Sequence, residues 1–376
     1  MDTFIPRHYD VLHSFMMPKR VTVIYGPRRV GKTTLVSKYL ETLGKDARVL
    51  RASGDNLSDR SLLSSQEAKL LLEWASGYDT VFIDEAQRIP DIGWGLKILI
   101  DARPELSLIV TGSFSFDLAH KLGEPLTLYP LAVGELLKTM NAFELRQNLE
   151  DFLVFGMYPE VRTAASAGQK QIILNELTES YLLKDILELE RIKKPKMLVN
   201  LLTLIALQVG SEVSLNELSG KLGVDMKTVE RYLDLLEKCF VLYNLRGFSR
   251  NLRSEVTKKS KYYFYDTGVR NAVIRNYNPL ALRNDAGALW ENFMILERLK
   301  ARSYGAVYAR DYFWRTWEKQ EIDLLEEREG CLYAFEFKWS PKKKAKIPSA
   351  FSAAYPDSIF QVISPENFLQ YLGCDA

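Results

Sequence analysis

The chain has 376 residues, of which 47% are hydrophobic and 26% are charged, and its formal net charge is +2. This length suggests two or three domains, and the composition is ordinary for a soluble globular protein. No apolar run approaches the roughly 18 residues of a membrane span, and the first residues lack a secretory pattern. The three cysteines lie far apart and there are three histidines, so we expect neither disulfides nor a zinc site, and a cytoplasmic location.

A phosphate-binding loop is predicted at residues 26–33, which read Gly-Pro-Arg-Arg-Val-Gly-Lys-Thr and fit the spacing G-x-x-x-x-G-K-[ST]. The apolar run 21–25 predicts a buried strand before it, and the apolar spacing from Leu35 onward predicts a helix after it. Lys32 is expected to reach the β- and γ-phosphates, and the Thr33 hydroxyl to hold Mg²⁺. The predicted nucleotide-binding residues are Gly26, Pro27, Arg28, Arg29, Val30, Gly31, Lys32, Thr33 and Thr34.

A second apolar run ends in two acids. Residues 79–87 read Asp-Thr-Val-Phe-Ile-Asp-Glu-Ala-Gln, and a strand that ends Asp84-Glu85 about fifty residues after a P-loop is typical of the other half of an NTPase site. Asp84 is expected to hold Mg²⁺ through water or through Thr33. Glu85 is expected to orient and polarise the attacking water.

The strand predicted at 106–113 ends in Thr111 and Ser113. Its hydroxyls either help position the water or sense the γ-phosphate, or they only form a strand-end turn. Other predicted elements are a strand at 47–52, a helix at 66–76 and a strand at 126–131. Strands that alternate with helices predict an α/β fold with a parallel sheet and helices on both faces. The predicted catalytic residues are Lys32, Asp84, Glu85 and Ser113.

These motifs resemble those of an AAA-type ATPase. More narrowly, they resemble a prokaryotic family of poorly characterised ATPases in which this module precedes a C-terminal domain of unknown role. Softer landmarks extend the resemblance over nearly the whole chain, at residues 129–131, 156–160, 181–185, 265–268 and 289–292. The family usually has Gly-Arg before Tyr-Pro-Leu, whereas this chain has Gly123-Glu124. If that Arg is a finger for a neighbour's γ-phosphate, this protein lacks it, and Arg28 and Arg29 are alternative positive charges.

Residues 135–208 read mostly as helix, with apolar spacing over 143–155, 171–190 and 195–208, and the first fits a lid on the ATPase core. Ser214 opens a short helix, and residues 226–240 form a second one, as in a helix-turn-helix. Strands at 241–248 and 261–265 complete a winged helix. Basic side chains available to nucleic acid are Lys227 and Arg231 beside Thr228 on the second helix, and Arg250, Arg253, Lys258 and Lys259 between the strands.

The segment from Arg191 to Lys261 carries 14 Lys/Arg against 7 Asp/Glu. This excess of positive charge favours a polyanion such as DNA, or it is a solvated surface. Winged helices of this kind also serve as hinges or protein contacts, so fold alone does not decide the partner.

The last third holds a second possible chemistry. A helix at 288–300 carries Glu291, a strand at 320–325 carries Asp323, and a strand at 332–339 carries Glu336 and Lys338 on one face. Carboxylates beside a lysine suit Mg²⁺ or Mn²⁺, which would activate a water. The set Glu291, Asp323, Glu336 and Lys338, with Glu321 on the Asp323 face, resembles the PD-(D/E)xK nuclease fold. Lys342, Lys343, Lys344 and Lys346 then grip a nucleic-acid backbone or form a solvated loop.

The sequence therefore predicts an AAA-type ATPase core (1–135), a helical lid (136–194), a winged helix (195–270) and a PD-(D/E)xK nuclease-like domain (284–376). The leading hypothesis is an ATP-binding and ATP-hydrolysing switch that uses Mg²⁺ and controls a module for nucleic acid or a protein partner. The alternatives are a Mg²⁺-dependent nuclease for which ATP is a regulatory ligand, and an interaction module whose assembly ATP controls. An oligomer is compatible with all three.

Overall fold

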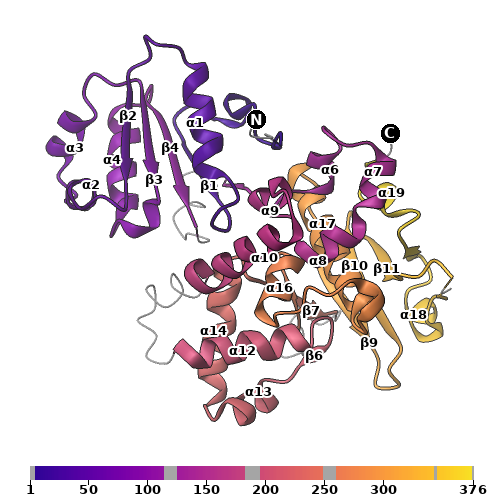
Figure 1. The fold of residues 1–376 in the computed structure, drawn as a ribbon. Helices are drawn as coiled ribbons and strands as arrows, with labels where there is room; N and C mark the ends of the chain where they lie inside the picture. Colours follow the sequence, from indigo (N-terminus) through magenta and orange to yellow (C-terminus); the bar gives the residue numbers. More distant parts are fainter. Residues whose placement is uncertain (1–4, 114–124, 183–194, 249–259, 343–344, 375–376) are drawn as a thin grey trace. The chain divides into compact units, whose positions relative to one another are not determined.

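The computed structural model describes residues 5–113, 125–182, 195–248, 260–342 and 345–374 (Figure 1). The chain divides into two compact units. The N-terminal unit comprises residues 6–129 together with 238–240, and the C-terminal unit is formed mainly by residues 130–237 and 241–376. None of the described helices has the length and apolar character that a membrane crossing requires.

A five-stranded parallel sheet forms the centre of the N-terminal unit, in the order β2–β3–β4–β1–β5 (Figure 1). The strands are β1 (Val21–Tyr25), β2 (Val49–Ser53), β3 (Thr80–Asp84), β4 (Ser107–Gly112) and β5 (Leu126–Thr127). Because the strands are parallel and β4 lies between β1 and β3, the loops after these three strands leave the sheet at the same edge. The parallel sheet predicted from the alternating pattern is confirmed.

The helices of this unit are α1 (Lys32–Thr42), α2 (Leu57–Leu63), α3 (Ala68–Trp74) and α4 (Ile92–Ala102), with single 3₁₀ turns η1 (Leu12–Phe15) and η2 (Ala86–Arg88). The connection through α1 runs from β1 past β4 and β3 to β2. The connections through α2 and α3 (from β2 to β3) and through α4 (from β3 to β4) run back across the sheet in the opposite direction. Right-handed crossovers therefore place α1 on the opposite face from the other three. The strand predicted at 126–131 is shorter than expected, since Pro130 lacks the N–H that would extend the ladder.

A seven-stranded mixed sheet organises the C-terminal unit, in the order β12–β11–β10–β9–β7–β8–β6. Its strands are β6 (Glu212–Val213), β7 (Leu242–Gly247), β8 (Ser260–Phe264), β9 (Arg310–Arg315), β10 (Glu321–Arg328), β11 (Cys331–Phe337) and β12 (Ile359–Ile363). β9, β10 and β11 pair antiparallel in sequence, as the predicted hairpin requires, and β12 is parallel to β11.

Helices make up most of the rest of this unit. They are α6 (Val133–Leu136), α7 (Ala142–Gln147), α8 (Leu149–Phe155), α9 (Pro159–Thr163), α10 (Ala167–Glu176), α12 (Pro195–Leu207), α13 (Leu215–Leu222), α14 (Met226–Lys238), α16 (Thr267–Val273), α17 (Ala286–Tyr304), α18 (Ser349–Ala354) and α19 (Phe368–Tyr371). A π-helical turn, η3 (Leu177–Leu182), continues α10, and η4 (Leu280–Leu282) is 3₁₀. The predicted helix 171–190 is confirmed as far as residue 182, and its remainder lies outside the described residues.

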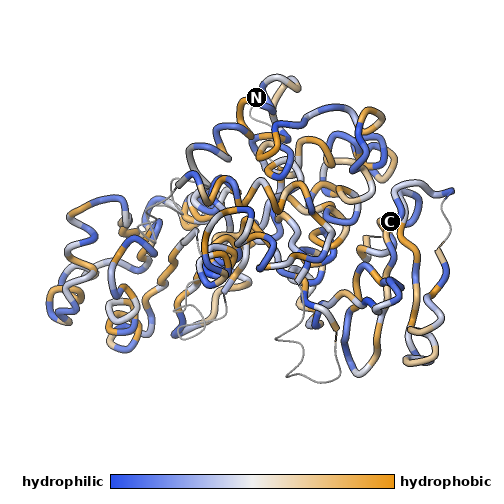
Figure 2. The backbone as a smooth tube through the Cα atoms, turned by 90° about the horizontal axis from the view of Figure 1, so that it is seen from below, coloured by the Kyte–Doolittle hydropathy of each residue, from blue (hydrophilic) through white to orange (hydrophobic). Residues whose placement is uncertain are grey.

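Hydrophobic and hydrophilic segments alternate along the chain (Figure 2).

The elements expected of a winged helix are present: α13, a turn at Gly223 with φ 66°, α14, and the antiparallel pair β7 and β8. β7 also pairs in parallel with β9 through Arg246–Tyr312 and Gly247–Phe313. The hairpin is therefore part of the same sheet as the strands of the last third. The predicted domain boundaries stay predictions, and one of them falls between strands that share this sheet.

Two of the sequence landmarks, residues 156–160 and 265–268, are in close contact within this unit. Gly156 has φ 72°, and a Cβ there would lie 2.0 Å from Oδ1 of the buried Asp266. The other carboxylate oxygen of Asp266 accepts a 2.6 Å hydrogen bond from the Met157 N–H. A Cβ at Gly268 would meet the Phe155 carbonyl oxygen at 2.2 Å. The two segments approach so closely that only glycine fits at either position.

Gly156→Ala is expected to lower the free energy of unfolding by about 3 kcal/mol, because it combines a left-handed backbone with a clash against Asp266. Gly220→Ala is the matched control, since a Cβ at Gly220 in α13 meets nothing within 4 Å. That control should raise stability by up to about 1 kcal/mol. Urea denaturation followed by circular dichroism measures both. Equal stability of Gly156→Ala and the wild type would contradict the close packing.

Candidate functional site

The loop between β1 and α1 has the backbone of a phosphate-binding loop. Gly26 (φ 145°), Arg29 (φ 59°) and Gly31 (φ 94°) all have positive φ. A Cβ at Gly26 would lie 1.9 Å from the Leu128 carbonyl oxygen, so no larger residue fits. Helix α1 begins directly after Gly31, which places its unpaired first N–H groups at the end of the loop.

Lys32 is the first residue of α1, directly after this loop, and is 5% exposed. Its ammonium donates hydrogen bonds to the carbonyl oxygens of Gly26 (2.9 Å) and Pro27 (2.8 Å) and lies 3.4 Å from the Ser113 hydroxyl. Carbonyl oxygens of the loop therefore hold the Lys32 ammonium beside the backbone N–H groups that would bind a phosphate. Ser113 comes from the end of β4, as the sequence predicts for the strand beside Asp84.

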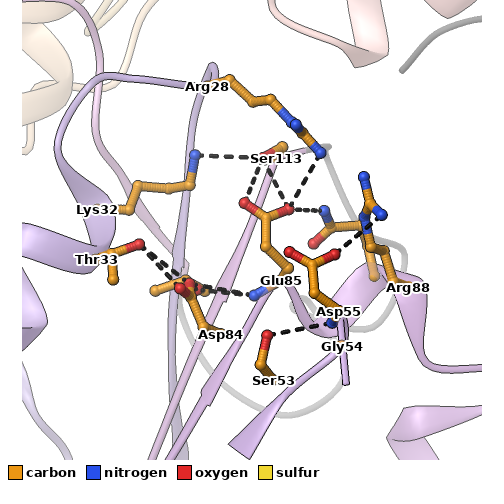
Figure 3. A network of polar contacts seen from close by, with 12 residues as sticks. Arg28, Lys32, Thr33, Ser53, Gly54, Asp55, Asp84, Glu85, Arg88 and Ser113 are labelled. Carbon is orange, nitrogen blue, oxygen red and sulfur yellow. Dashed lines mark hydrogen bonds and ion pairs between the residues drawn. The ribbon is translucent and has the colours of Figure 1, made fainter. Parts of the chain in front are cut away.

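Asp84, at the end of β3, gathers hydroxyls from two other elements (Figure 3). The Thr33 hydroxyl lies 3.0 and 3.2 Å from the two carboxylate oxygens of Asp84, and the Thr111 hydroxyl also donates to this carboxylate. Carboxylate and hydroxyl oxygens are hard donors of the kind that Mg²⁺ prefers. The donor set therefore fits the Mg²⁺ that accompanies a nucleotide, with Thr33 and Asp84 as the residues that would hold it.

The Glu85 carboxylate has partners from three segments (Figure 3). The Gln87 side-chain amide donates to its Oε2 at 2.5 Å, and the Ser113 hydroxyl lies 3.3 Å from both carboxylate oxygens. Arg28, in the P-loop, places its Nη2 3.9 Å from the same Oε2. The Glu85 carboxylate is therefore held among polar side chains from the P-loop, the η2 turn and the end of β4.

Two glycines make room for this acidic turn. Glu85 itself has φ 50° and ψ 43°, a left-handed conformation that costs a non-glycine residue about 1–3 kcal/mol. A Cβ at Gly54 would lie 2.2 Å from the Glu85 carbonyl oxygen, and a Cβ at Gly112 would lie 3.1 Å from Oε1 of Gln87. The Gly54 N–H also bonds to the Asp84 carbonyl oxygen at 2.8 Å.

A buried arginine forms hydrogen bonds that stabilise the P-loop. Arg7 is 5% exposed, and its guanidinium donates to the carbonyl oxygens of Val30 and Tyr129, the latter at 2.6 Å. No motif predicts these contacts of Arg7, because the residue lies outside the spacing of the P-loop. Gln87 was missed, although it stands two residues after Glu85, because its role depends on a side-chain contact rather than on a motif.

The C-terminal unit contains the second predicted cluster. Asp323 on β10 accepts the Phe337 N–H at 2.9 Å, and the Lys338 ammonium lies 2.5 Å from Oε1 of Glu336. Glu291 comes from the first turns of α17. Among the residues that the structure describes, no group of three or more acidic, histidine or cysteine side chains is placed to hold a metal ion. Metal binding at this cluster stays a prediction.

The sequence did not predict that β8 also contributes to this cluster. Lys261 is 1% exposed, forms an ion pair with Glu321, and places its ammonium 3.6 Å from Oε1 of Glu291. The Tyr263 hydroxyl donates to Glu291 at 2.6 Å. The hairpin predicted as a wing thus inserts a cation among the acids. The only feature of the sequence that could have indicated this role is that Lys261 stands within the apolar and aromatic run of that strand.

Burial dominates the electrostatics of these acids. It raises the pKa of Asp323 well above its usual value, and the nearby charges of Glu291 and Glu336 add to the effect while Lys261 opposes it. Burial also raises the pKa of Glu291, against the opposing effect of Lys261 and Tyr263. Burial lowers the pKa of Lys338, but the hydrogen bond with Glu336 and the negative charges of Glu336, Asp323 and Glu291 together outweigh it and leave this pKa raised.

The basic residues predicted for nucleic acid are described only in part. Lys227 and Arg231 are exposed on α14, whereas Thr228 bonds to Asp225 in the first turn of that helix. Lys342 and Lys346 are exposed. The remaining predicted basic residues, Arg250, Arg253, Lys258, Lys259, Lys343 and Lys344, lie outside the described residues. So does Glu124, at which the chain departs from the family's Gly-Arg pattern.

Comparison with known proteins places the chain in a family. Uncharacterized proteins of Mycobacterium tuberculosis and Mycobacterium bovis are each 31% identical over 325 residues, which cover 85% of this chain and 70% of the relative. The chain belongs to their family. An uncharacterized protein of Methanocaldococcus jannaschii is 23% identical over 356 residues, covering 88% of this chain and 78% of the relative.

Domain families match most of the sequence. Residues 18–137 match an AAA domain, residues 146–280 a domain of unknown function (DUF8612), and residues 286–371 another (DUF4143). The first match contains the P-loop, the Asp84-Glu85 strand and the Thr111–Ser113 strand end. The predicted AAA-type P-loop ATPase domain is therefore confirmed, whereas the winged helix and the nuclease-like fold stay predictions.

Solved structures are more distant. A signal transduction ATPase with a tetratricopeptide repeat sensor from Pyrococcus horikoshii has a TM-score of 0.27 and 16% identity, covering 81% of this chain and 48% of that one. DnaA from Aquifex aeolicus, bound to AMPPCP, has a TM-score of 0.22 and 16% identity, with coverage of 57% and 81%. Neither likeness is close enough to transfer a role.

The stability of the folded protein should depend on pH through the buried Asp323. Its folded pKa is raised above the unfolded value of about 3.9, so the folded state holds the extra proton and loses stability as pH rises from that value toward the folded pKa. Asp323→Asn removes this loss and should gain stability relative to the wild type as pH rises from about 4 to about 8.

Thermal unfolding of both proteins in metal-free buffer at several pH values measures the effect. Asp357→Asn, at an exposed position, is the control for the loss of one negative charge. A stability difference between Asp323→Asn and the wild type that is independent of pH would show that Asp323 is not held in its protonated form.

Proposed function

We propose that this protein binds ATP with Mg²⁺ and hydrolyses it, and that it acts as a switch that controls its C-terminal unit. The observation that carries the proposal is the convergence of polar groups from three segments at one edge of the parallel sheet. These groups are Lys32 and Thr33 from the P-loop and α1, Asp84 and Glu85 from the end of β3, and Thr111 and Ser113 from the end of β4.

Each residue has a separate role in this proposal. The loop amides and Lys32 bind the β- and γ-phosphates, and Lys32 exchanges its loop carbonyls for phosphate oxygens. Thr33 and Asp84 hold Mg²⁺, which when bound neutralises phosphate charge. Glu85 orients a water and takes its proton as the water oxygen bonds to the γ-phosphorus and the bond from phosphorus to the ADP oxygen breaks. Ser113 orients the Glu85 carboxylate.

The C-terminal unit is the part that such a switch would control. The exposed Lys227 and Arg231 on α14, within a segment of net positive charge, support DNA as a partner. A protein partner or a second copy of the chain is an alternative recipient of the signal.

Two substitutions separate binding from turnover. Lys32→Ala should abolish ATP binding and turnover, because the loop loses its phosphate-facing cation. Glu85→Gln should retain nucleotide binding but lose about 10²–10⁴-fold in turnover, because a proton acceptor is removed. Phosphate release and titration with a fluorescent nucleotide measure the two properties. Lys97→Ala, exposed on α4, is the control, and intact turnover in Lys32→Ala would refute the assignment.

A Mg²⁺- or Mn²⁺-dependent nuclease is the second candidate. The observation in its favour is that Glu291 and Glu336 act electrostatically on Asp323, with Lys338 beside Glu336. Cleavage of single- and double-stranded DNA and of RNA, with and without ATP, is the test. Cutting that is lost in Asp323→Ala and Lys338→Ala but kept in Glu85→Gln would favour this candidate. Absence of cutting while phosphate is released would favour the switch alone.

A further inference from the structure

The P-loop supplies two cations that face the catalytic side of the nucleotide site (Figure 3). Lys32 is held by the loop carbonyls of Gly26 and Pro27. Arg28 instead extends from the loop toward Glu85, and its Nη2 lies 3.9 Å from Oε2. The guanidinium therefore lies between the loop in which phosphates bind and the acid that activates water.

The partners of Glu85 differ in strength. Gln87 donates a 2.5 Å hydrogen bond from the 3₁₀ turn that follows Glu85 directly, so it is close and local. The contact with Arg28 is at the outer limit of an ion pair, and the two side chains keep 20% and 17% of their surface exposed. A partly exposed pair at this distance contributes little stability and is easily exchanged. Glu85 thus has hydrogen-bond partners in Gln87 and Ser113, and a more distant partner, Arg28, that it can release.

A terminal phosphate is a stronger partner for a guanidinium than a single carboxylate is. It carries more negative charge and offers several oxygens to the planar fork of donors. We propose that Arg28 is a γ-phosphate sensor that exchanges partners: it pairs with Glu85 when no triphosphate is present, and with the γ-phosphate when ATP binds. The exchange frees Glu85 to hold the attacking water. This inference rests on the proposed ATPase function and adds its regulation.

The exchange of partners by Arg28 affects nucleotide affinity as well as turnover. ADP has no γ-phosphate, so Arg28 contributes to the affinity for a triphosphate and not to that for a diphosphate. In addition, Glu85 competes with the γ-phosphate for Arg28. Removing the negative charge of Glu85 should therefore tighten triphosphate binding, and only while Arg28 is present.

The first experiment titrates the full-length protein, with Mg²⁺, against a non-hydrolysable ATP analogue and against ADP. Arg28→Ala is expected to reduce the preference for the triphosphate at least about tenfold, the effect of one charge-assisted hydrogen bond, with ADP affinity nearly unchanged. Arg28→Lys should retain part of the preference, because it keeps the charge but loses the fork. Arg48→Ala removes an arginine that pairs with Asp79 at the opposite edge of the sheet and should behave as wild type.

The second experiment is a double-mutant cycle on triphosphate affinity with Glu85→Gln and Arg28→Ala. Glu85→Gln should tighten binding a few-fold in the wild-type background and have no effect in the Arg28→Ala background. Equal effects in both backgrounds, or an unchanged triphosphate preference in Arg28→Ala and Arg28→Lys, would overturn the exchange. A wild type that binds neither nucleotide would instead refute the proposed ATPase function.

Discussion

The left-handed turn at Glu85 is the constraint on which the nucleotide site depends. A non-glycine residue at φ 50° is strained, and the strain persists because surrounding groups hold the backbone in place. Gly54 permits the close approach of the neighbouring strand end, and Gly112 leaves space for Gln87, which holds the carboxylate. The turn brings the acid to the edge of the sheet where the P-loop lies. Strain at this point is therefore compensated by the same contacts that orient the Glu85 carboxylate.

In the C-terminal unit, one buried charge determines how the acids Glu291, Glu321 and Asp323 are grouped. Lys261 is almost completely buried, and a buried charge is tolerated only with partners of the opposite sign. Glu291 and Glu321 supply them from α17 and β10, so three elements that are distant in sequence are tied together by one ammonium. The parallel pairing of β7 with β9 makes this possible, since it brings the hairpin that carries Lys261 into the sheet of the last third.

Local sequence patterns were enough to predict the elements and much of the nucleotide site. The P-loop spacing, the Asp84-Glu85 strand end and the Thr111–Ser113 strand end each follow from short-range chemistry, and the parallel order of the strands brings them together. Arg7, Gln87 and Lys261 could not be predicted in the same way. Their roles come from side-chain contacts across the fold, such as the bond from Arg7 to the Tyr129 carbonyl, which no spacing within one element encodes.

The two clusters also differ in how readily they can respond to a ligand. Around Glu85 the carboxylate and the Arg28 guanidinium keep part of their surface in water, so they can change partners at small energetic cost. Around Asp323, that acid and Lys261 are both buried, and a divalent ion would have to displace or share the buried ammonium. Leaving a buried ammonium without its acids is strongly destabilising. The exchangeable groups of the nucleotide site therefore support the proposal that this protein responds to ATP.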